Sequence, residues 1–213
     1  HLRTRRQRQM CIRDRLDSLC FGEGPRWRDG HLWLSDMHDQ KVLKVSPDGH
    51  SEVVVALADD QPSGLGWMPN GDLLIVAMRS KRLLRFDSNE ISVHADLSEL
   101  ASGFCNDMVV DKIGRAYVGN FGFDIHNNAP RKNAEIILVE PDGSSRCVND
   151  EVLFPNGTVI TPDGRTLIVA ETIAGQLSAF DIEANGDLTN RRLWARLPAV
   201  SYTHLTLPTS PKV

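Results

Sequence analysis

The stretches Gly64-Leu-Gly-Trp-Met-Pro-Asn-Gly-Asp-Leu-Leu-Ile-Val-Ala77 and Asn156-Gly-Thr-Val-Ile-Thr-Pro-Asp-Gly-Arg-Thr-Leu-Ile-Val-Ala170 share one pattern. Each reads as an apolar strand, a turn closed by glycine, and a second apolar strand. Two further stretches, Gly24–Asp36 and Asn106–Gly119, repeat this pattern. The turn glycines are Gly30, Gly71, Gly114 and Gly164, at spacings of 41, 43 and 50 residues. A repeat at this period indicates an array of similar supersecondary units.

A third strand is expected after each pair of strands. The expected third strands are Lys41–Val45, Arg82–Phe86, Glu135–Glu140 and Gln176–Asp181. Turn sequences such as Asp29-Gly30 and Asn70-Gly71 favour hairpins, because Asn, Asp and Gly tolerate positive φ. About four strands per ~45-residue unit, with no long helical periodicity, predict an all-β β-propeller with about four blades. A β-sandwich is the alternative, but sandwiches do not repeat one strand-turn-strand register at this period.

The two ends of the chain are related to each other as sense and antisense translations. Met10-Cys-Ile-Arg-Asp14 can be encoded by ATG TGT ATA AGA GAC, whose reverse complement encodes Val200-Ser-Tyr-Thr-His204. The relation continues outward to His1 and Val213. An inverted adaptor at both ends of a DNA fragment produces this relation, whereas folding and targeting do not. We therefore expect non-native tails at 1–14 and 200–213, and a partial propeller domain at 15–199.

Composition excludes several classes of protein. The 213 residues are 41% hydrophobic and contain no apolar run of the ~18 residues that a membrane-spanning helix needs. The formal net charge is -4, but the tails carry six of the 24 basic and one of the 28 acidic residues. The remaining 18 basic and 27 acidic residues give -9, which argues against a nucleic-acid partner. Four cysteines without a close pair favour a reducing compartment, so a cytoplasmic location is expected.

Polar residues stand near the start of each expected innermost strand, the strand that lines the channel of a propeller. They are Glu23, Ser63, Asn106 with Asp107, and Asn156. Carboxylate and amide oxygens that converge on an axis suit a hard cation such as Ca²⁺, Mg²⁺ or Mn²⁺. Taken singly, each of these residues is also compatible with a role in capping a turn.

The sequence resembles the senescence marker protein, gluconolactonase and luciferin-regenerating enzyme family. The matching stretches are Gly22–Trp27, Asn106–Arg115, Gly119–Gly122 and Phe154–Gly157. The resemblance implies a six-bladed propeller with one divalent metal ion (Ca²⁺, Zn²⁺, Mn²⁺ or Mg²⁺) in the channel. It implies metal-assisted hydrolysis of a small lactone or ester, in which the cation polarises the carbonyl and activates water.

The resemblance also assigns individual residues. The family's metal-ligand Glu and Asn fall on Glu23 and Asn156, and its substrate-contacting Asn falls on Asn106. An acidic substrate contact aligns with Asp124. Phe104 occupies the substrate-site position where sugar lactonases of the family have Arg, which implies a less polar substrate than gluconolactone.

The resemblance implies a further metal-ligand Asp from a later blade, and no matching segment follows Pro198. The 213-residue chain is therefore expected to be inactive, and the catalytic residue stays unassigned. The native metal, the substrate and the oligomeric state stay open. A non-catalytic propeller that binds a small ligand or a protein, and a strictosidine-synthase-like or paraoxonase-like propeller, are the alternatives.

Overall fold

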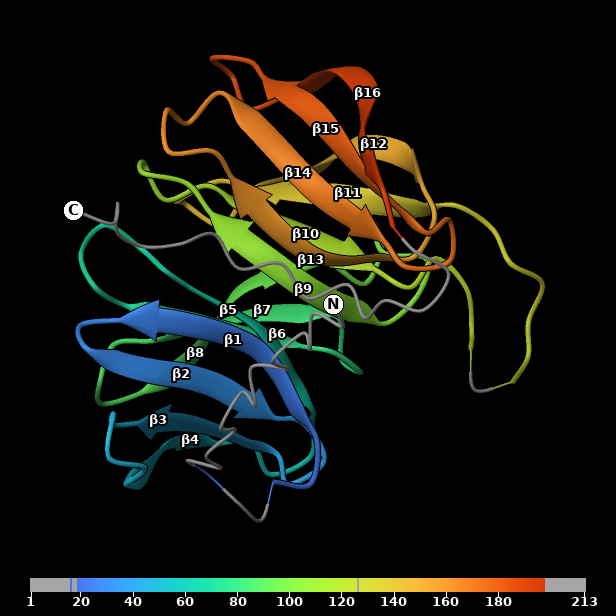
Figure 1. The fold of residues 1–213 in the computed structure, drawn as a ribbon. Helices are drawn as coiled ribbons and strands as arrows, with labels where there is room; N and C mark the ends of the chain where they lie inside the picture. The colour runs from blue at the N-terminus through green and yellow to red at the C-terminus, as the bar shows by residue number, and fades with distance from the viewer. Residues whose placement is uncertain (1–15, 17–18, 126, 198–213) are drawn as a thin grey trace, which may run out of the picture.

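Four antiparallel sheets of four strands each make up the described part of the computed structural model, which comprises residues 16, 19–125 and 127–197 (Figure 1). The predicted tails, 1–14 and 200–213, lie outside these residues. The strands of every sheet are hydrogen-bonded in chain order, so each sheet is a meander, here called a blade. None of the described residues is helical, and they accordingly contain no helix that could cross a membrane.

The strands of blade 1 are β1 (Gly22–Arg28), β2 (His31–Asp36), β3 (Lys41–Val45) and β4 (Ser51–Ala56). The strands of blade 2 are β5 (Pro62–Trp67), β6 (Leu73–Ala77), β7 (Arg82–Phe86) and β8 (Ile91–Asp96). The strands of blade 3 are β9 (Cys105–Val110), β10 (Ala116–Asn120), β11 (Ala134–Val139) and β12 (Ser145–Val152). The strands of blade 4 are β13 (Pro155–Ile160), β14 (Thr166–Glu171), β15 (Gln176–Ile182) and β16 (Leu188–Arg196).

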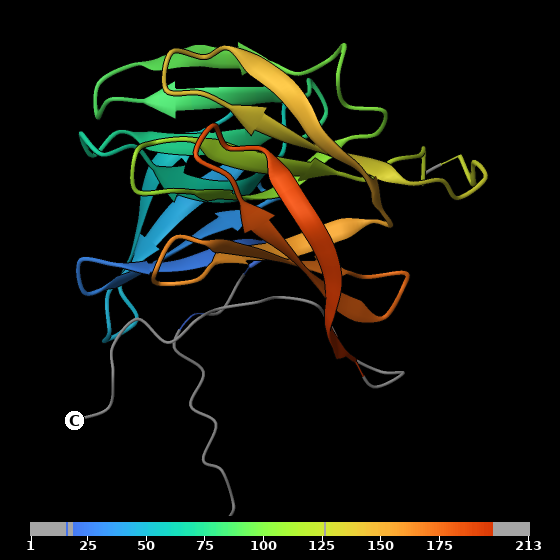
Figure 2. The same cartoon turned by 90° about the horizontal axis from the view of Figure 1, so that it is seen from above.

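The blades follow one another around a common centre. Their innermost strands β1, β5, β9 and β13 contact each other in that order, and the two views agree on this arrangement (Figures 1 and 2). The predicted all-β propeller with four blades is confirmed. The third strands Lys41–Val45 and Arg82–Phe86 have the predicted bounds, while β11 begins and ends one residue earlier than predicted.

The turns between the first two strands of the blades use two mechanisms. In blade 1, Asp29 and Gly30 both have positive φ, of 49° and 75°, as a tight two-residue hairpin requires. In the other blades the only turn residue with positive φ is the glycine, and an Asn or Asp side chain closes a longer turn. Asp111 shows this arrangement, because its Oδ1 accepts hydrogen bonds from the amides of Ile113 (3.0 Å) and Arg115 (2.9 Å).

The hydrophobic core lies between the blades. Successive side chains of a strand point to opposite faces, and in blade 3 both faces are buried. Val118 of β10 packs toward blade 2, whereas Tyr117 of the same strand packs with Leu167 and Phe180 of blade 4. A third cluster, which includes Val42 and Leu65, joins blades 1 and 2.

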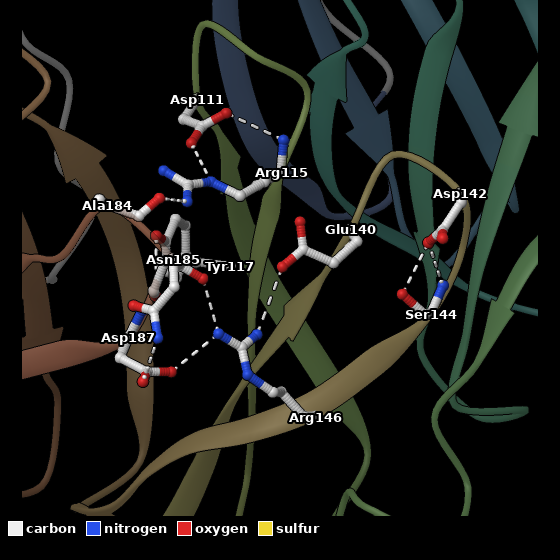
Figure 3. A network of polar contacts seen from close by, with 11 residues as sticks. Asp111, Arg115, Tyr117, Glu140, Asp142, Ser144, Arg146, Ala184, Asn185 and Asp187 are labelled. Carbon is white, nitrogen blue, oxygen red and sulfur yellow. Dashed lines mark hydrogen bonds and ion pairs between the residues drawn. The ribbon is translucent and has the colours of Figure 1, made fainter.

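Side chains of blade 3 also clamp the turn between β15 and β16 (Figure 3). Arg115, Tyr117 and Arg146 donate hydrogen bonds to the carbonyls of residues 184–186, at donor–acceptor distances of 2.7–3.1 Å. Asp111 orients Arg115 through an ion pair at 2.7 Å. These bonds fix blade 4 against blade 3 at the periphery, as the core does nearer the centre.

Glycines allow the innermost strands to approach each other closely. A Cβ on Gly64 of β5 would lie 2.5 Å from the amide nitrogen of Met108 in β9 and 2.9 Å from the carbonyl carbon of Asp107. A Cβ on Gly24 of β1 would lie 2.6 Å from the carbonyl oxygen of Ser63. Both contacts are to backbone, which cannot move aside without shifting a whole strand.

Buried polar side chains fix the segments that lead into the innermost strands. In every blade, the first residue of the innermost strand pairs with the same position of the second strand. This position is occupied by Asp36, Ala77, Asn120 and Glu171 in blades 1 to 4 respectively. Asp36 accepts hydrogen bonds from the amides of Cys20 (3.0 Å) and Phe21 (2.8 Å). Asn120 Oδ1 accepts from the amides of Gly103 (3.1 Å) and Gly122 (2.8 Å).

Glu171 is the largest of these buried groups, with 1% of its surface exposed. It accepts hydrogen bonds from the Leu153 amide (2.8 Å), Arg191 (2.7 Å), Gln176 (3.2 Å) and the Ser178 hydroxyl. Burial alone would raise the pKa of this carboxyl, but the hydrogen bonds from Ser178, Arg191, Leu153 and Gln176 outweigh it and lower the pKa. Glu171 is therefore held as a carboxylate inside blade 4.

Replacement of Gly64 by Ala tests the close approach of the innermost strands. We expect Gly64→Ala to lower the free energy of unfolding by about 1–3 kcal/mol, because the added methyl group meets backbone. Gly22→Ala is the matched control, since its Cβ would meet only the ends of the Leu19 and Leu34 side chains, at 3.3 and 3.5 Å. Urea denaturation of both variants measures the difference, and equal stabilities would contradict the packing account.

Replacement of Glu171 by Gln tests the buried carboxylate. At pH 7 we expect Glu171→Gln to lower the free energy of unfolding by about 1.5–3 kcal/mol, the range for hydrogen bonds to charged groups. The pKa is lower in the folded state, so this stabilisation is present above the unfolded pKa of about 4.3 and is lost as the pH falls through the folded value. Denaturation curves between pH 7 and acid should therefore converge for the two proteins.

The exposed Glu99→Gln provides a control for the loss of one negative charge. A stability difference that is the same for Glu99→Gln and Glu171→Gln, or one that does not depend on pH, would show that Glu171 is not held as a charged group.

Candidate metal and substrate site

Four of the polar residues predicted for the channel occupy one equivalent position in the blades. Glu23, Ser63, Asn106 and Asn156 are each the second residue of an innermost strand, β1, β5, β9 and β13 respectively. The repeat in the sequence is therefore also a repeat in space. At this position, each blade presents one oxygen-bearing side chain at the same end of its innermost strand.

Hydrogen bonds link two of these positions to each other and to the first residue of β13. Ser63 Oγ lies 3.4 Å from Asn106 Oδ1, and Asn106 Nδ2 donates to the carbonyl of Pro155 at 3.0 Å. Ser63 and Asn106 are 1% and 5% exposed. Pro155 precedes Asn156, so the Asn106 side chain ties blade 3 to the start of β13. Asn106 is thus held in place from both neighbouring blades.

Asn156 differs from the others because its Oδ1 is buried and has no hydrogen-bond partner among the described residues. A buried acceptor left unpaired carries a desolvation cost of about 1–3 kcal/mol, so such an atom indicates a ligand that would complete it. An amide oxygen together with the carboxylate of Glu23 is a donor set that fits a hard divalent cation. Within the described part of the chain, no three His, Cys, Asp or Glu side chains gather into a metal-binding group.

Asp107, which was predicted together with Asn106, has a different role. Its Oδ1 forms an ion pair with Arg26 Nη2 of β1 at 2.7 Å, and the same guanidinium donates to the carbonyl of Met108 at 2.6 Å. Alternation along β9 places the Asp107 and Asn106 side chains on opposite faces. Asp107 is therefore a contact between blades 1 and 3 that holds the innermost strands together.

Phe104 and Asp124, the predicted substrate contacts, line one cavity of about 150 Å³. Phe104 lies in the segment that enters β9, and Asp124 lies in the loop between β10 and β11, which projects from the sheets (Figure 2). Asp124 Oδ2 accepts a hydrogen bond from Asn127 Nδ2 at 2.7 Å, and its Oδ1 accepts one from the Asn127 amide at 3.1 Å. The structure thus brings these two residues together, although they come from separate segments.

Cys105 lies between Phe104 and Asn106, and it is fully buried. Burial raises the pKa of its thiol to about 12, so the thiol is neutral at pH 7. A neutral buried thiol is a poor nucleophile. Cys105 is therefore a packing residue beside the site.

Sequence reasoning missed the buried groups that position these segments, namely Asp36, Asn120 and Glu171. A polar residue recurring at the end of the second strand was the available signal. This signal does not reveal the role of the three side chains, because the backbone amides that they bind lie in other segments. For most of these hydrogen bonds the side chain and the amide are 15–18 residues apart in the sequence.

The comparisons with known proteins agree with this architecture. Residues 21–203 match the model of the SMP-30/gluconolactonase/LRE-like region. The structure is similar to that of a gluconolactonase from Xanthomonas campestris, with a TM-score of 0.68 and 23% identity over 83% of this chain and 63% of that chain. It is similar to a calcium-binding protein, regucalcin, from Agrobacterium tumefaciens, with a TM-score of 0.67 and 22% identity over 85% of this chain and 60% of that chain.

A luciferin-regenerating enzyme is a further structural relative, with a TM-score of 0.67 and 16% identity over 81% of this chain and 59% of that chain. At these identities the likeness concerns the fold. The chain spans less than two thirds of the length of each of these three proteins. Because the family model matches most of its residues, the chain belongs to the SMP-30/gluconolactonase/LRE-like family.

Proposed function

We propose that this chain is part of a metal-dependent hydrolase of lactones or related esters, similar to gluconolactonase. The observation that carries the proposal is the buried, unpaired Oδ1 of Asn156, at the strand position that Glu23 occupies in blade 1. Family membership and the likeness to a gluconolactonase and to a calcium-binding protein support it.

Glu23 and Asn156 would hold one divalent cation, Ca²⁺, Zn²⁺, Mn²⁺ or Mg²⁺, through their side-chain oxygens. A cation held there would supply Lewis-acid chemistry, polarising the lactone carbonyl and lowering the pKa of water. Asn106 would position the substrate, because its contacts to Ser63 and Pro155 leave one amide hydrogen for a ligand. Phe104 and Asp124 would contact the part of the substrate that lies in the cavity.

The chain would not catalyse the reaction alone. Its four blades span 63% of the gluconolactonase that it resembles, close to the share expected for four blades of six. Glu23 and Asn156 supply only two of the protein ligands that the proposed cation needs. We propose that a longer protein contributes a further carboxylate from a later blade and works on a small molecule in a cytoplasmic setting.

A non-catalytic propeller that binds a small ligand is the second candidate. Phe104 favours it, since it occupies a substrate-site position where an Arg would bind a polar or charged group. Binding without turnover would distinguish this candidate from the hydrolase.

The test uses a six-bladed protein that contains this segment. We expect lactone hydrolysis that requires an added divalent cation, is abolished by a chelator, and is lost in Glu23→Gln and Asn156→Ala. The loss in kcat/KM should exceed about 100-fold, because changes to outer-shell partners of metal sites already cost about 10–100-fold. Glu99→Gln should keep full activity, since Glu99 is exposed. Turnover that persists in the chelator would contradict a metal-dependent mechanism, and no turnover with any lactone or ester would favour the binding protein.

A further inference from the structure

The wall of the cavity of about 150 Å³ includes three phenylalanine side chains, here called its aromatic wall. Phe104, Phe121, Phe123 and Ile125 supply its apolar surface, and Lys81 and Asp124 are among its polar residues. Lys81 comes from blade 2 and the others come from segments of blade 3, so the cavity lies between two blades. All of these residues are in the described part of the chain.

The aromatic wall is held in one arrangement by Phe154, which immediately precedes β13. The rings of Phe121 and Phe154 are stacked, with centroids 4.6 Å apart and an interplanar angle of 9°. The Phe123 ring lies 6.0 Å from that of Phe154. Phe154 is only 9% exposed, so it forms a rigid support behind the cavity. Such offset or tilted ring pairs are stabilising, and they leave the lining rings little freedom.

The polar side chains around the cavity already have protein partners. Lys81 Nζ donates to the carbonyl of Ala101 at 2.8 Å. Ser102, which also lines the cavity, donates its hydroxyl to Glu135 at 2.8 Å. Asp124 accepts from Asn127 at 2.7 Å. These contacts use part of the hydrogen-bonding capacity of each group, whereas the side chains of Phe104, Phe121, Phe123 and Ile125 offer a hydroxyl no partner, and buried hydroxyls without partners are costly.

The size of the cavity matches a single aromatic ring. A volume of about 150 Å³ is large enough to hold benzene where the lining is apolar, as it is along Phe104, Phe121, Phe123 and Ile125. Phe104 is two residues before Asn106, and Phe154 is two residues before Asn156. Phe104 therefore belongs to the segment that leads to the proposed substrate-positioning amide, and Phe154 ties the lining ring of Phe121 to the segment that leads to the proposed metal ligand.

We propose that this cavity is the subsite for an apolar, phenyl-sized substituent of the substrate. The inference rests on the proposed function for the identity of the reacting group, a lactone or ester. It goes beyond that function by naming the class of substrate. The substrate would be a lactone or ester that bears an aromatic or bulky aliphatic group. Phe104 is then a specificity-determining residue that excludes sugars and contacts the substituent.

The binding test uses the 213-residue chain itself and a probe that cannot be hydrolysed, a γ-lactam that carries a para-fluorophenyl group. Fluorine NMR reports its binding. We expect Phe104→Ser to weaken binding by about tenfold or more, the effect of losing an apolar contact in a specificity pocket. Ile125→Ser should weaken it by several-fold, and this residue is 42% exposed, so its replacement tests the cavity without disturbing the core.

Ile113→Ser is the matched control, because Ile113 is 61% exposed and lies in the turn beyond the opposite end of β9. It should bind the lactam like the unchanged chain. The unsubstituted γ-lactam should not displace the probe at equal concentration. Absence of probe binding, or equal binding by the unchanged chain, Ile125→Ser and Ile113→Ser, would overturn the proposal.

Hydrolysis separates this inference from the proposed function. In the six-bladed protein, γ-phenyl-γ-butyrolactone should have a higher kcat/KM than glucono-δ-lactone, and Phe104→Arg should reverse the preference. If the lactam binds as expected but no lactone or ester is hydrolysed, the subsite stands and the hydrolase falls. If glucono-δ-lactone is hydrolysed faster and the lactam does not bind, the hydrolase stands and the subsite falls.

Discussion

The close approach of neighbouring innermost strands is the constraint on which the other features of the structure depend. Gly64 lies so near the backbone of Asp107 and Met108 that no side chain fits between the two strands. Because β5 and β9 touch at that point, the second residue of each strand is brought to the same level. Ser63 and Asn106 can then share a hydrogen bond across the blade boundary. A wider spacing would place water between them and would separate the candidate ligands.

Charged groups then secure this arrangement without joining the proposed reaction. Arg26 reaches from β1 to Asp107 and to the carbonyl of Met108, and so holds blade 1 against blade 3. Glu171 is buried in blade 4 beneath the segment that carries Phe154 and Pro155. The carboxylates of Asp107 and Glu171 both accept hydrogen bonds from protein donors, which is the condition for keeping a charge inside a protein. The Oδ1 of Asn156 lacks such a match, and this contrast distinguishes a candidate ligand from the structural polar groups around it.

Much of the fold follows from local sequence signals, whereas the site depends on contacts between distant segments. The strands of each blade are marked by glycine turns about one unit apart, so Lys41–Val45 and Arg82–Phe86 could be placed to the residue. The role of Asp107 could not be predicted, because its partner Arg26 lies 81 residues away. The cavity lined by Phe104 was also beyond local reasoning, since Phe154, which supports it, comes from the next blade. The resemblance to a family supplied Glu23 and Asn156 as ligands, and residue spacing alone supplied only their shared position.

The central claim is that Asn156 and Glu23 contribute oxygens to one divalent cation. A crystal structure of a six-bladed protein that contains this segment, grown with Mn²⁺ and measured for anomalous scattering, tests it most directly. The account predicts one strong anomalous peak in the channel, about 2.0–2.6 Å from both Asn156 Oδ1 and a Glu23 carboxylate oxygen. A channel without a peak, or a peak bound by neither residue, would contradict it.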